Sequence, residues 1–244
     1  MSGRPLLVAI DTATRRAAIA LGAGSGVPRA SRSWEAGYRH GEELLAVLDE
    51  LLREAAIGLG DVTGVVVGTG PGAFTGLRVG MATAKGLAYG LHIPLVGVGS
   101  AAGLALAART ERHAPDDGMV VLMPAGPHDR YLARFAASGG GGDVRPSTVG
   151  DPELVPGAEP LEPLVDAMAV VAVDLVAGPG ISDEAVALGL AAQAGLGAAL
   201  LDAGREALER GHEDDVAELV PAYVTLPRGI TATAGTIEWS RDLR

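Results

Sequence analysis

The sequence predicts an α/β fold, because short apolar runs of strand length alternate with longer segments of helical periodicity. The chain has 244 residues, 48% of them hydrophobic, which is enough to bury a substantial core. Only 3% are aromatic, so that core must consist mainly of Ala, Val and Leu. In the first half, the predicted order is three strands, a helix, a strand, a helix, a strand and a helix.

The chain opens with a predicted β-hairpin. Apolar residues 6–10 and 17–21 flank the polar turn at 11–14, and residues 30–34 are a candidate third strand. The first helix is expected over 41–57, with two acidic residues in its first turn and leucines along one face (Glu42, Glu43, Leu44, Leu48, Leu51).

Two further strand and helix pairs complete the first half. Residues 65–67 and 94–98 are apolar strands, each followed by a helix, at 74–89 and 100–109. Ser100 is expected to cap the second of these helices.

The second half is less regular. Strands are expected at 119–123, 131–136 and 170–176, and a glycine-interrupted helix at 184–211. Residues 143–163, which follow a four-glycine loop, are punctuated by proline and expected to be irregular.

Composition excludes several classes of function. The chain has no cysteine, which excludes disulfide scaffolds, thiolate metal sites and cysteine nucleophiles. Its formal charge of −11 argues against unaided nucleic-acid binding, which depends on Lys and Arg neutralising phosphates. The apolar run at 6–10 is too short for a signal peptide, and we expect no stretch long enough to span a membrane. We therefore expect a soluble, cytoplasmic protein.

A glycine-rich loop between a predicted strand and a predicted helix is the strongest local motif. Residues 68–78 read GTGPGAFTGLR. Such a loop can present backbone N–H groups to a phosphate or carboxylate. It matches neither a dinucleotide fingerprint nor a Walker loop, since Lys85 is too far from a glycine. The alternative, which we weight more heavily, is a tight turn that lets the helix pack closely.

Small residues recur every four positions along the helix after this loop: Gly72, Gly76, Gly80, Ala84 and Ala88. Glycine inside a helix costs about 1 kcal/mol relative to alanine, so this ridge needs a compensating close contact. The contact could lie within the chain or with another chain, and the residues alone favour the former.

The turn at 11–14 is a second candidate for phosphate binding. Asp11, Thr12 and Thr14 place a carboxylate and two hydroxyls at the end of a strand. Similar turns face the nucleotide in actin-like and sugar-kinase-like folds, although Asp and Thr are also ordinary turn residues.

The histidines do not form a metal site by spacing. No two of the five lie three or four residues apart, and Leu44 stands where a second histidine would pair with His40 (His40, His92, His113, His128, His212). A metalloprotease activity is therefore disfavoured, and we assign no catalytic or metal-ligating residue.

Five motifs in order closely resemble the TsaB family, whose members act in tRNA threonylcarbamoyladenosine synthesis. They are residues 8–14 (VAIDTAT), 40–44 (HGEEL), 67–78 (VGTGPGAFTGLR), 84–88 (AKGLA) and 93–98 (IPLVGV). The resemblance covers about residues 6–100. Beyond residue 110 it is faint, although Pro221-Ala222-Tyr223 resembles the closing Pro-x-Tyr of the family.

The resemblance implies an actin-like (ASKHA, RNase H-like) two-lobed fold with mixed β-sheets flanked by helices. The lobes would be residues 1–105 and a smaller or degenerate 106–227, followed by a tail at 228–244. It also implies a cytoplasmic, non-catalytic subunit that binds and activates a TsaD-like threonylcarbamoyltransferase. A TsaE-like ATPase would join the pair, tRNA would be bound only through the complex, and the protein alone would form a homodimer.

The resemblance places the partner contact on the two helices of the first lobe. It therefore favours a contact of the glycine ridge with another chain over packing within this chain. The expected partner-binding residues are Leu44, Leu45, Leu48, Leu52, Gly72, Phe74, Gly76, Gly80 and Ala84. Asp11, Thr12, Thr14, Gly70 and Gly72 would be vestigial phosphate loops. No cofactor is expected, and ATP with Mg²⁺ would bind only at a subunit interface.

Two departures from the family pattern concern the second lobe. An Asp-Ala-Arg turn is replaced by Pro124-Ala125-Gly126, and the arginine after Pro-x-Tyr is replaced by Thr225. The alternative function is an ATP-dependent phosphotransferase or hydrolase of the actin/kinase fold, which would use Asp11, Thr12 and the glycine loop as phosphate cradles.

Overall fold

The first half of the chain forms a five-stranded mixed sheet in the order β3-β2-β1-β4-β5. The computed structural model describes residues 5–24, 26–36, 40–112, 118–126, 128–136, 148–157, 159, 161 and 169–224. The predicted order of elements in this half is confirmed. The strands are β1 (Leu7–Asp11), β2 (Arg16–Gly22), β3 (Ala30–Glu35), β4 (Gly64–Gly68) and β5 (Leu95–Val98).

Burial on both faces explains the composition of the central strands. β1 pairs antiparallel with β2, with Ile10 opposite Ile19, and parallel with β4, with Val8 opposite Val65. All residues of β1 and β4 are buried. A strand covered on both faces reads as a continuous apolar run, which is what these segments show.

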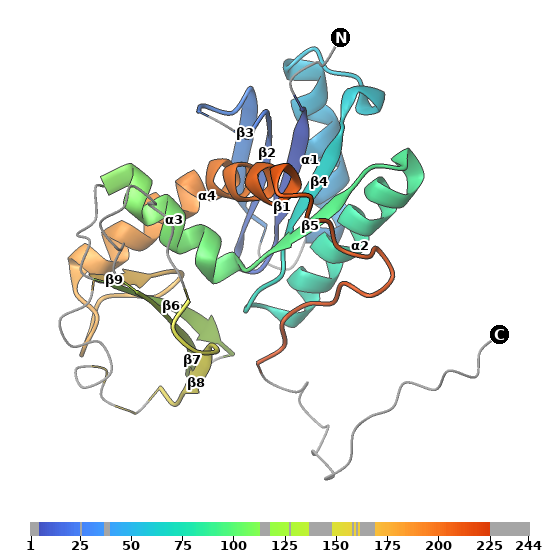
Figure 1. The fold of residues 1–244 in the computed structure, drawn as a ribbon. Helices are drawn as coiled ribbons and strands as arrows, with labels where there is room; N and C mark the ends of the chain where they lie inside the picture. Colours follow the sequence, from blue (N-terminus) through green and yellow to red (C-terminus); the bar gives the residue numbers. More distant parts are fainter. Residues whose placement is uncertain are drawn as a thin grey trace, which may run out of the picture.

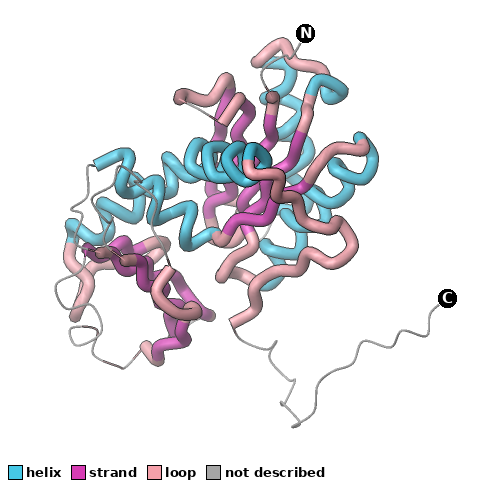
Figure 2. Tube along the Cα trace, in the orientation of Figure 1, coloured by secondary structure: helices cyan, strands magenta, loops and turns pink. Residues whose placement is uncertain are grey.

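Helices cover both faces of this sheet, α1 and α2 on one face and α4 on the other, where α3 packs on α4 (Figures 1 and 2). On one face, α1 packs its leucines against Val8 and Ile10 of β1, and α2 packs on β4. On the other face, Leu196 and Leu200 of α4 belong to one cluster with Ala9 of β1 and with α3. The helices are α1 (His40–Glu54), α2 (Phe74–Leu91), α3 (Ser100–Arg112) and α4 (Asp183–Glu209), and a short 3₁₀ helix spans Leu59–Asp61.

The second sheet repeats the strand order of the first without its fifth strand. Its order is β8-β7-β6-β9, with two antiparallel pairs and one parallel pair as in β3-β2-β1-β4. The predicted actin-like α/β class is confirmed, while the lobe boundaries stay a prediction. One strand, Glu153–Val155, lies in the segment expected to be irregular, and that expectation is wrong. The strands are β6 (Met119–Ala125), β7 (Asp129–Phe135), β8 (Glu153–Val155) and β9 (Ala169–Ala172).

Helix α4 packs on both sheets. Near its start, Gly189 lies against the backbone of Ala172 at the end of β9; near its end, Gly204 lies against Val66 of β4. The helix is long and apolar enough to span a membrane by length and composition, contrary to our expectation of no such stretch. Most of that apolar window is buried inside the protein, because it faces the sheets and α3.

After α4, residues 212–224 return across the first sheet and α2, and we call this segment the C-terminal strap (Figure 1). Asp214 donates its backbone N–H to Leu95 O of β5 at 2.8 Å. Its carboxylate accepts from Gly97 N at 2.7 Å. Further along, Ala222 N donates to Thr69 O at 2.8 Å. The strap thereby covers the β5 edge. The predicted tail at 228–244 lies outside the described residues.

The contact of α4 with β9 gives a test of the fold. A Cβ atom at Gly189 would lie 1.9 Å from the carbonyl oxygen of Ala172, so Gly189→Ala must push α4 away from β9. We expect a loss of about 3 kcal/mol in the free energy of unfolding, measured by urea denaturation. Gly86→Ala is the matched control, because a Cβ at Gly86 of α2 meets nothing within 4 Å. It should gain about 0.5–1 kcal/mol, and equal effects of the two substitutions would contradict this packing.

Candidate functional site

The row of small residues on α2 faces the sheet of its own chain. Gly76, Gly80, Ala84 and Ala88 are buried. A Cβ at Gly80 would lie 2.2 Å from Oγ1 of Thr12. The same hydroxyl donates to Gly76 O at 2.7 Å. The absence of side chains therefore lets α2 approach the β1–β2 turn.

This burial corrects most of the expected partner-binding set. Gly76, Gly80 and Ala84 lie inside the chain, and Gly72 is half-buried against the carbonyl of Ala13, 2.2 Å from where its Cβ would lie. The expected contact of these residues with another chain is wrong, because the β1–β2 turn of the same chain already occupies the space beside them. Gly80→Leu would therefore destabilise the monomer and not only its pairing.

The expected partner-binding leucines of α1 are mostly buried, and one is exposed. Leu44, Leu48 and Leu52 are buried against β1 and β2, so their expected contact with a partner is also wrong. The apolar side of the amphipathic helix packs on its own sheet, as helices in globular proteins commonly do. Leu45, in contrast, is 59% exposed and remains a candidate.

The predicted phosphate residues come together in a closed junction between the β1–β2 turn and the glycine loop. Asp11 is 0% exposed. Its carboxylate accepts from Ala13 N at 2.8 Å and from the Ser100 hydroxyl at 2.6 Å. Ser100 Oγ in turn accepts from Gly70 N at 3.0 Å. Sequence reasoning assigned Ser100 to a helix cap and missed this contact, which spans 89 residues.

Another donor of the glycine loop is used in the same way. Ala73 N donates to Ala13 O at 2.7 Å. A Cβ at Gly68 would lie 1.8 Å from Oδ2 of Asp11, so the loop and the turn touch without a gap. The two threonines expected at the phosphate site also form hydrogen bonds within the chain. Thr12 Oγ1 donates to Gly76 O, and Thr14 Oγ1 donates to Arg16 O at 2.8 Å. The binding of a nucleotide by these residues stays a prediction.

The same turn is bonded to the second half of the chain. Arg15 N donates to Asp174 Oδ2 at 2.8 Å, and Gln193 Nε2 donates to Asp174 Oδ1 at 2.8 Å. Gln193 is buried on α4, and Asp174 follows β9 with a φ of +53°. The turn that we considered as a phosphate site therefore contacts protein through the backbone of Arg15.

The outer side of α2 carries a second row of residues, all exposed, which we call the outer stripe: Thr75, Arg78, Ala82, Gly86 and Tyr89. Their spacing of three and four places them on one helix face. Small residues occupy its middle, and Tyr89 at one end is 78% exposed. The exposed Leu45 lies on α1, which packs beside α2.

Arg78 lies in a stack with two aromatic rings, one of which comes from the C-terminal strap. Its guanidinium carbon is 3.8 Å from the centroid of the Phe74 ring, and its Nε donates to the Tyr223 hydroxyl at 3.1 Å. The two rings lie 5.2 Å apart. The sequence pointed to Phe74 and Tyr223 separately, and nothing in it indicated that Arg78 joins them.

Other arginines are paired with carboxylates. The hydrogen bond that Arg32 donates to Glu54 raises the pKa of Arg32. The bonds that Arg53 donates to Asp49 and that Arg205 donates to Asp202 likewise raise the pKa of these two arginines. Arginine is already protonated at every physiological pH, so these shifts introduce no pH dependence.

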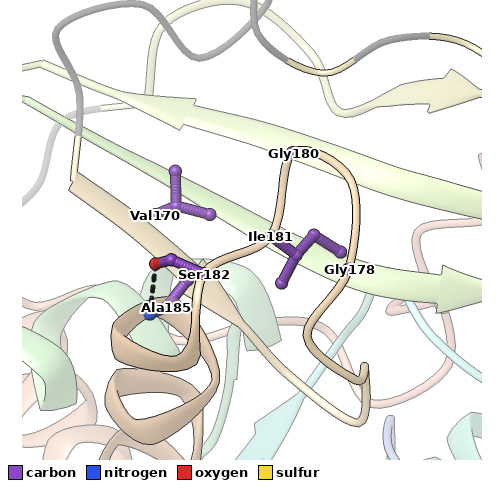
Figure 3. Close-up of a pocket in the computed structure, with 6 residues that line it drawn as sticks. All are labelled: Val170, Gly178, Gly180, Ile181, Ser182 and Ala185. Atoms are coloured by element: carbon purple, nitrogen blue, oxygen red, sulfur yellow. Dashed lines mark hydrogen bonds between the residues drawn. The ribbon is translucent and has the colours of Figure 1, made fainter.

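A cavity of about 330 Å³ lies beside the start of α4 (Figure 3). Ser182, the one polar side chain among the described residues that line it, accepts from Ala185 N at 3.1 Å as the helix cap. The other described lining residues are aliphatic or glycine and offer no group for catalysis. The lining residues are Val170, Gly178, Gly180, Ile181, Ser182 and Ala185.

Within the described ranges, no three His, Cys, Asp or Glu side chains are grouped so that they could hold a metal ion. His92 ends α2 in the left-handed conformation and stacks on Tyr89 at 6.5 Å. His212 lies 3.7 Å from Asp214. His113 lies outside the described residues.

Comparison with known protein families gives a match over residues 34–145 to the TsaD family of tRNA N6-adenosine threonylcarbamoyltransferases. The TsaB protein of Escherichia coli is 34% identical over 93 residues, 38% of this chain and 39% of that protein. An uncharacterised protein of Mycobacterium leprae is 33% identical over 178 residues, 65% of this chain and 48% of that protein. The chain thus spans less than half the length of these relatives.

Solved structures extend the likeness to nearly the whole chain. YeaZ from Pseudomonas aeruginosa superposes with a TM-score of 0.65 and 25% identity, over 90% of this chain and 99% of that one. A second Pseudomonas aeruginosa structure, described as similar to peptidase YeaZ, superposes with a TM-score of 0.67 and 25% identity. The match covers 91% of this chain and 100% of that one. Since the sequence motifs, the named TsaB relative and the complete YeaZ fold agree, the chain belongs to the TsaB family.

Proposed function

We propose that this protein is a non-catalytic subunit that binds and activates a TsaD-like threonylcarbamoyltransferase during N6-threonylcarbamoyladenosine modification of tRNA. Its membership of the TsaB family supports a role in this pathway. The proposed contact is the outer face of α1 and α2, formed by Leu45 and the outer stripe.

The observation that carries the proposal is an exposed glycine inside α2, Gly86, for which the chain itself gives no structural reason. Glycine in an exposed helix interior costs about 1 kcal/mol relative to alanine. Inner glycines such as Gly80 have a reason within the chain, because a Cβ would clash with Thr12. A Cβ at Gly86 meets nothing, so its small size has no purpose in the monomer. Together with exposed Tyr89 and Leu45, it fits the close approach of a helix from a second chain.

The acidic composition of the chain also fits a role within a complex. A chain of net charge −11 is poorly suited to hold tRNA by itself, so tRNA would be bound through the complex. A TsaE-like ATPase is a further proposed member. Alone, the same apolar surface would associate with a second copy, and we propose a homodimer in the absence of the partner.

An ATP-dependent phosphotransferase or hydrolase remains the second candidate, because Asp11, Thr12 and the glycine loop do meet. Against it, the Asp11 carboxylate and the Gly70 N–H are bonded to Ser100, and Ala73 N is bonded to Ala13 O. A phosphate would have to displace these buried contacts. A nucleotide, if one is used, would lie at an interface between subunits.

Gly86→Leu tests the partner surface. We expect it to weaken binding to the organism's TsaD-like protein at least tenfold in isothermal titration calorimetry, because a leucine would hold the two helices apart. The matched control is Ala194→Leu, since Ala194 is an exposed position on α4, away from this face. Equal affinities of the two variants would show that the outer stripe is not the contact. Failure of the unmodified proteins to associate, with tRNA modification proceeding normally without this chain, would refute the proposed function.

The second candidate function predicts nucleotide binding by the isolated chain, whereas our proposal predicts none. We expect no saturable heat when ATP with Mg²⁺ is titrated into the protein alone, because Asp11, Gly70 N and Ala73 N are already bonded within the chain. The same titration into the complex with the TsaD-like partner serves as the comparison. Tight binding and turnover of ATP by the isolated protein would instead favour the phosphotransferase or hydrolase.

A further inference from the structure

Arg78 is a fixed cation without an acidic partner among the described residues. Arg15, Arg32, Arg53, Arg134, Arg205 and Arg210 each lie within salt-bridge distance of a carboxylate. Arg78 is held instead by the Phe74 ring and the Tyr223 hydroxyl, both neutral. Arg16 and Arg130 also bond neutral groups, but both are only half-exposed, whereas Arg78 is exposed.

The stack orders the guanidinium, and no carboxylate of the described residues compensates its charge. The ring contact and the bond at Nε restrict the long side chain, so less rotamer freedom is lost when a ligand binds. Nε is the nitrogen that donates to the Tyr223 hydroxyl, and among the described residues the terminal nitrogens donate no hydrogen bond. A planar carboxylate can receive two parallel hydrogen bonds from such a group.

The neighbourhood of Arg78 fits a protein surface better than an RNA backbone. The residues around it are aromatic or uncharged, including Thr75 on the same helix face and Tyr223, which is 42% exposed. Binding to nucleic acid takes several cations along the phosphate track. The next cation on α2, Lys85, is two turns away and donates to Ala217 O of the strap at 3.1 Å. Arginine and tyrosine beside an apolar area are typical of the energetic centres of protein interfaces.

We propose that Arg78 binds a carboxylate of the TsaD-like partner and that Phe74 and Tyr223 are positioning residues for it. This inference rests on the proposed function. Arg78 belongs to the outer stripe, two turns from Gly86, so a chain packed on α2 would reach both. Because Tyr223 is part of the C-terminal strap, the strap would contribute to partner affinity without touching the partner.

The test is partner affinity measured by isothermal titration calorimetry at low and moderate salt. Arg78→Met should weaken binding about tenfold to hundredfold, the cost of losing a charge-assisted pair. Arg78→Lys should recover only part of the affinity, because an ammonium group cannot form the two parallel bonds. Tyr223→Phe should weaken binding severalfold while keeping the charge. Arg29→Met is the control for net charge, since Arg29 is exposed in the turn before β3.

A double-mutant cycle then identifies the acid. Individual Asp→Asn and Glu→Gln substitutions on the partner should reveal one acidic residue whose substitution weakens binding to the unmodified chain but has no further effect on binding to Arg78→Met. Thermal unfolding of each variant checks that the chain stays folded.

The outcomes separate the two levels of the proposal. If the unmodified proteins do not associate, the proposed function fails and this inference with it. If they associate and Arg78→Met binds as tightly as Arg29→Met, only the inference fails. If Arg78→Met leaves partner affinity unchanged but weakens the affinity of the complex for tRNA, the cation meets RNA phosphate, and the carboxylate proposal is wrong.

Discussion

Asp11 is a fully buried carboxylate, and its surroundings set the architecture of the first sheet and α2. An unpaired charge in that position would cost several kcal/mol, so the chain must supply its hydrogen bonds. Ser100 and the backbone of Ala13 supply them. Satisfying Asp11 in this way brings the start of α3 and the glycine loop against the β1–β2 turn, and this draws α2 onto the same turn through Gly76 and Gly80.

The consequence for function is a division between the two sides of α2. On the inner side, small residues serve contacts with the chain's own backbone and with Thr12. On the outer side, Ala82 and Gly86 lie between Arg78 and Tyr89 on an exposed surface. Asp11 and Gly70 N, which we considered as a phosphate site, are bonded within the chain, while the outer side of α2 is exposed and is the surface that we propose for a second chain. The family's role in tRNA modification and our proposal of a binding subunit agree with that division.

The sequence predicted the elements well because strands such as β1 are continuous apolar runs and helices such as α1 have helical periodicity. It also located the two loops that meet at Asp11. It could not decide which side of α2 faces the sheet, because Gly72, Gly76 and Gly80 on one side and Ala82, Gly86 and Gly90 on the other repeat with the same spacing. Contacts between distant positions, such as Ser100 with Asp11 and Tyr223 with Arg78, leave no local signal. The position of α4 across both sheets was missed for the same reason.

Hydrogen–deuterium exchange on the protein, alone and in complex with its TsaD-like partner, tests the central claim most directly. We expect the complex to add protection in α1 and α2, where a partner would cover backbone amides, and little change in β6–β9 or in α4. Because exchange follows the whole backbone, it does not depend on choosing a residue in advance. New protection confined to the second sheet or α4, with α1 and α2 unchanged, would contradict the account.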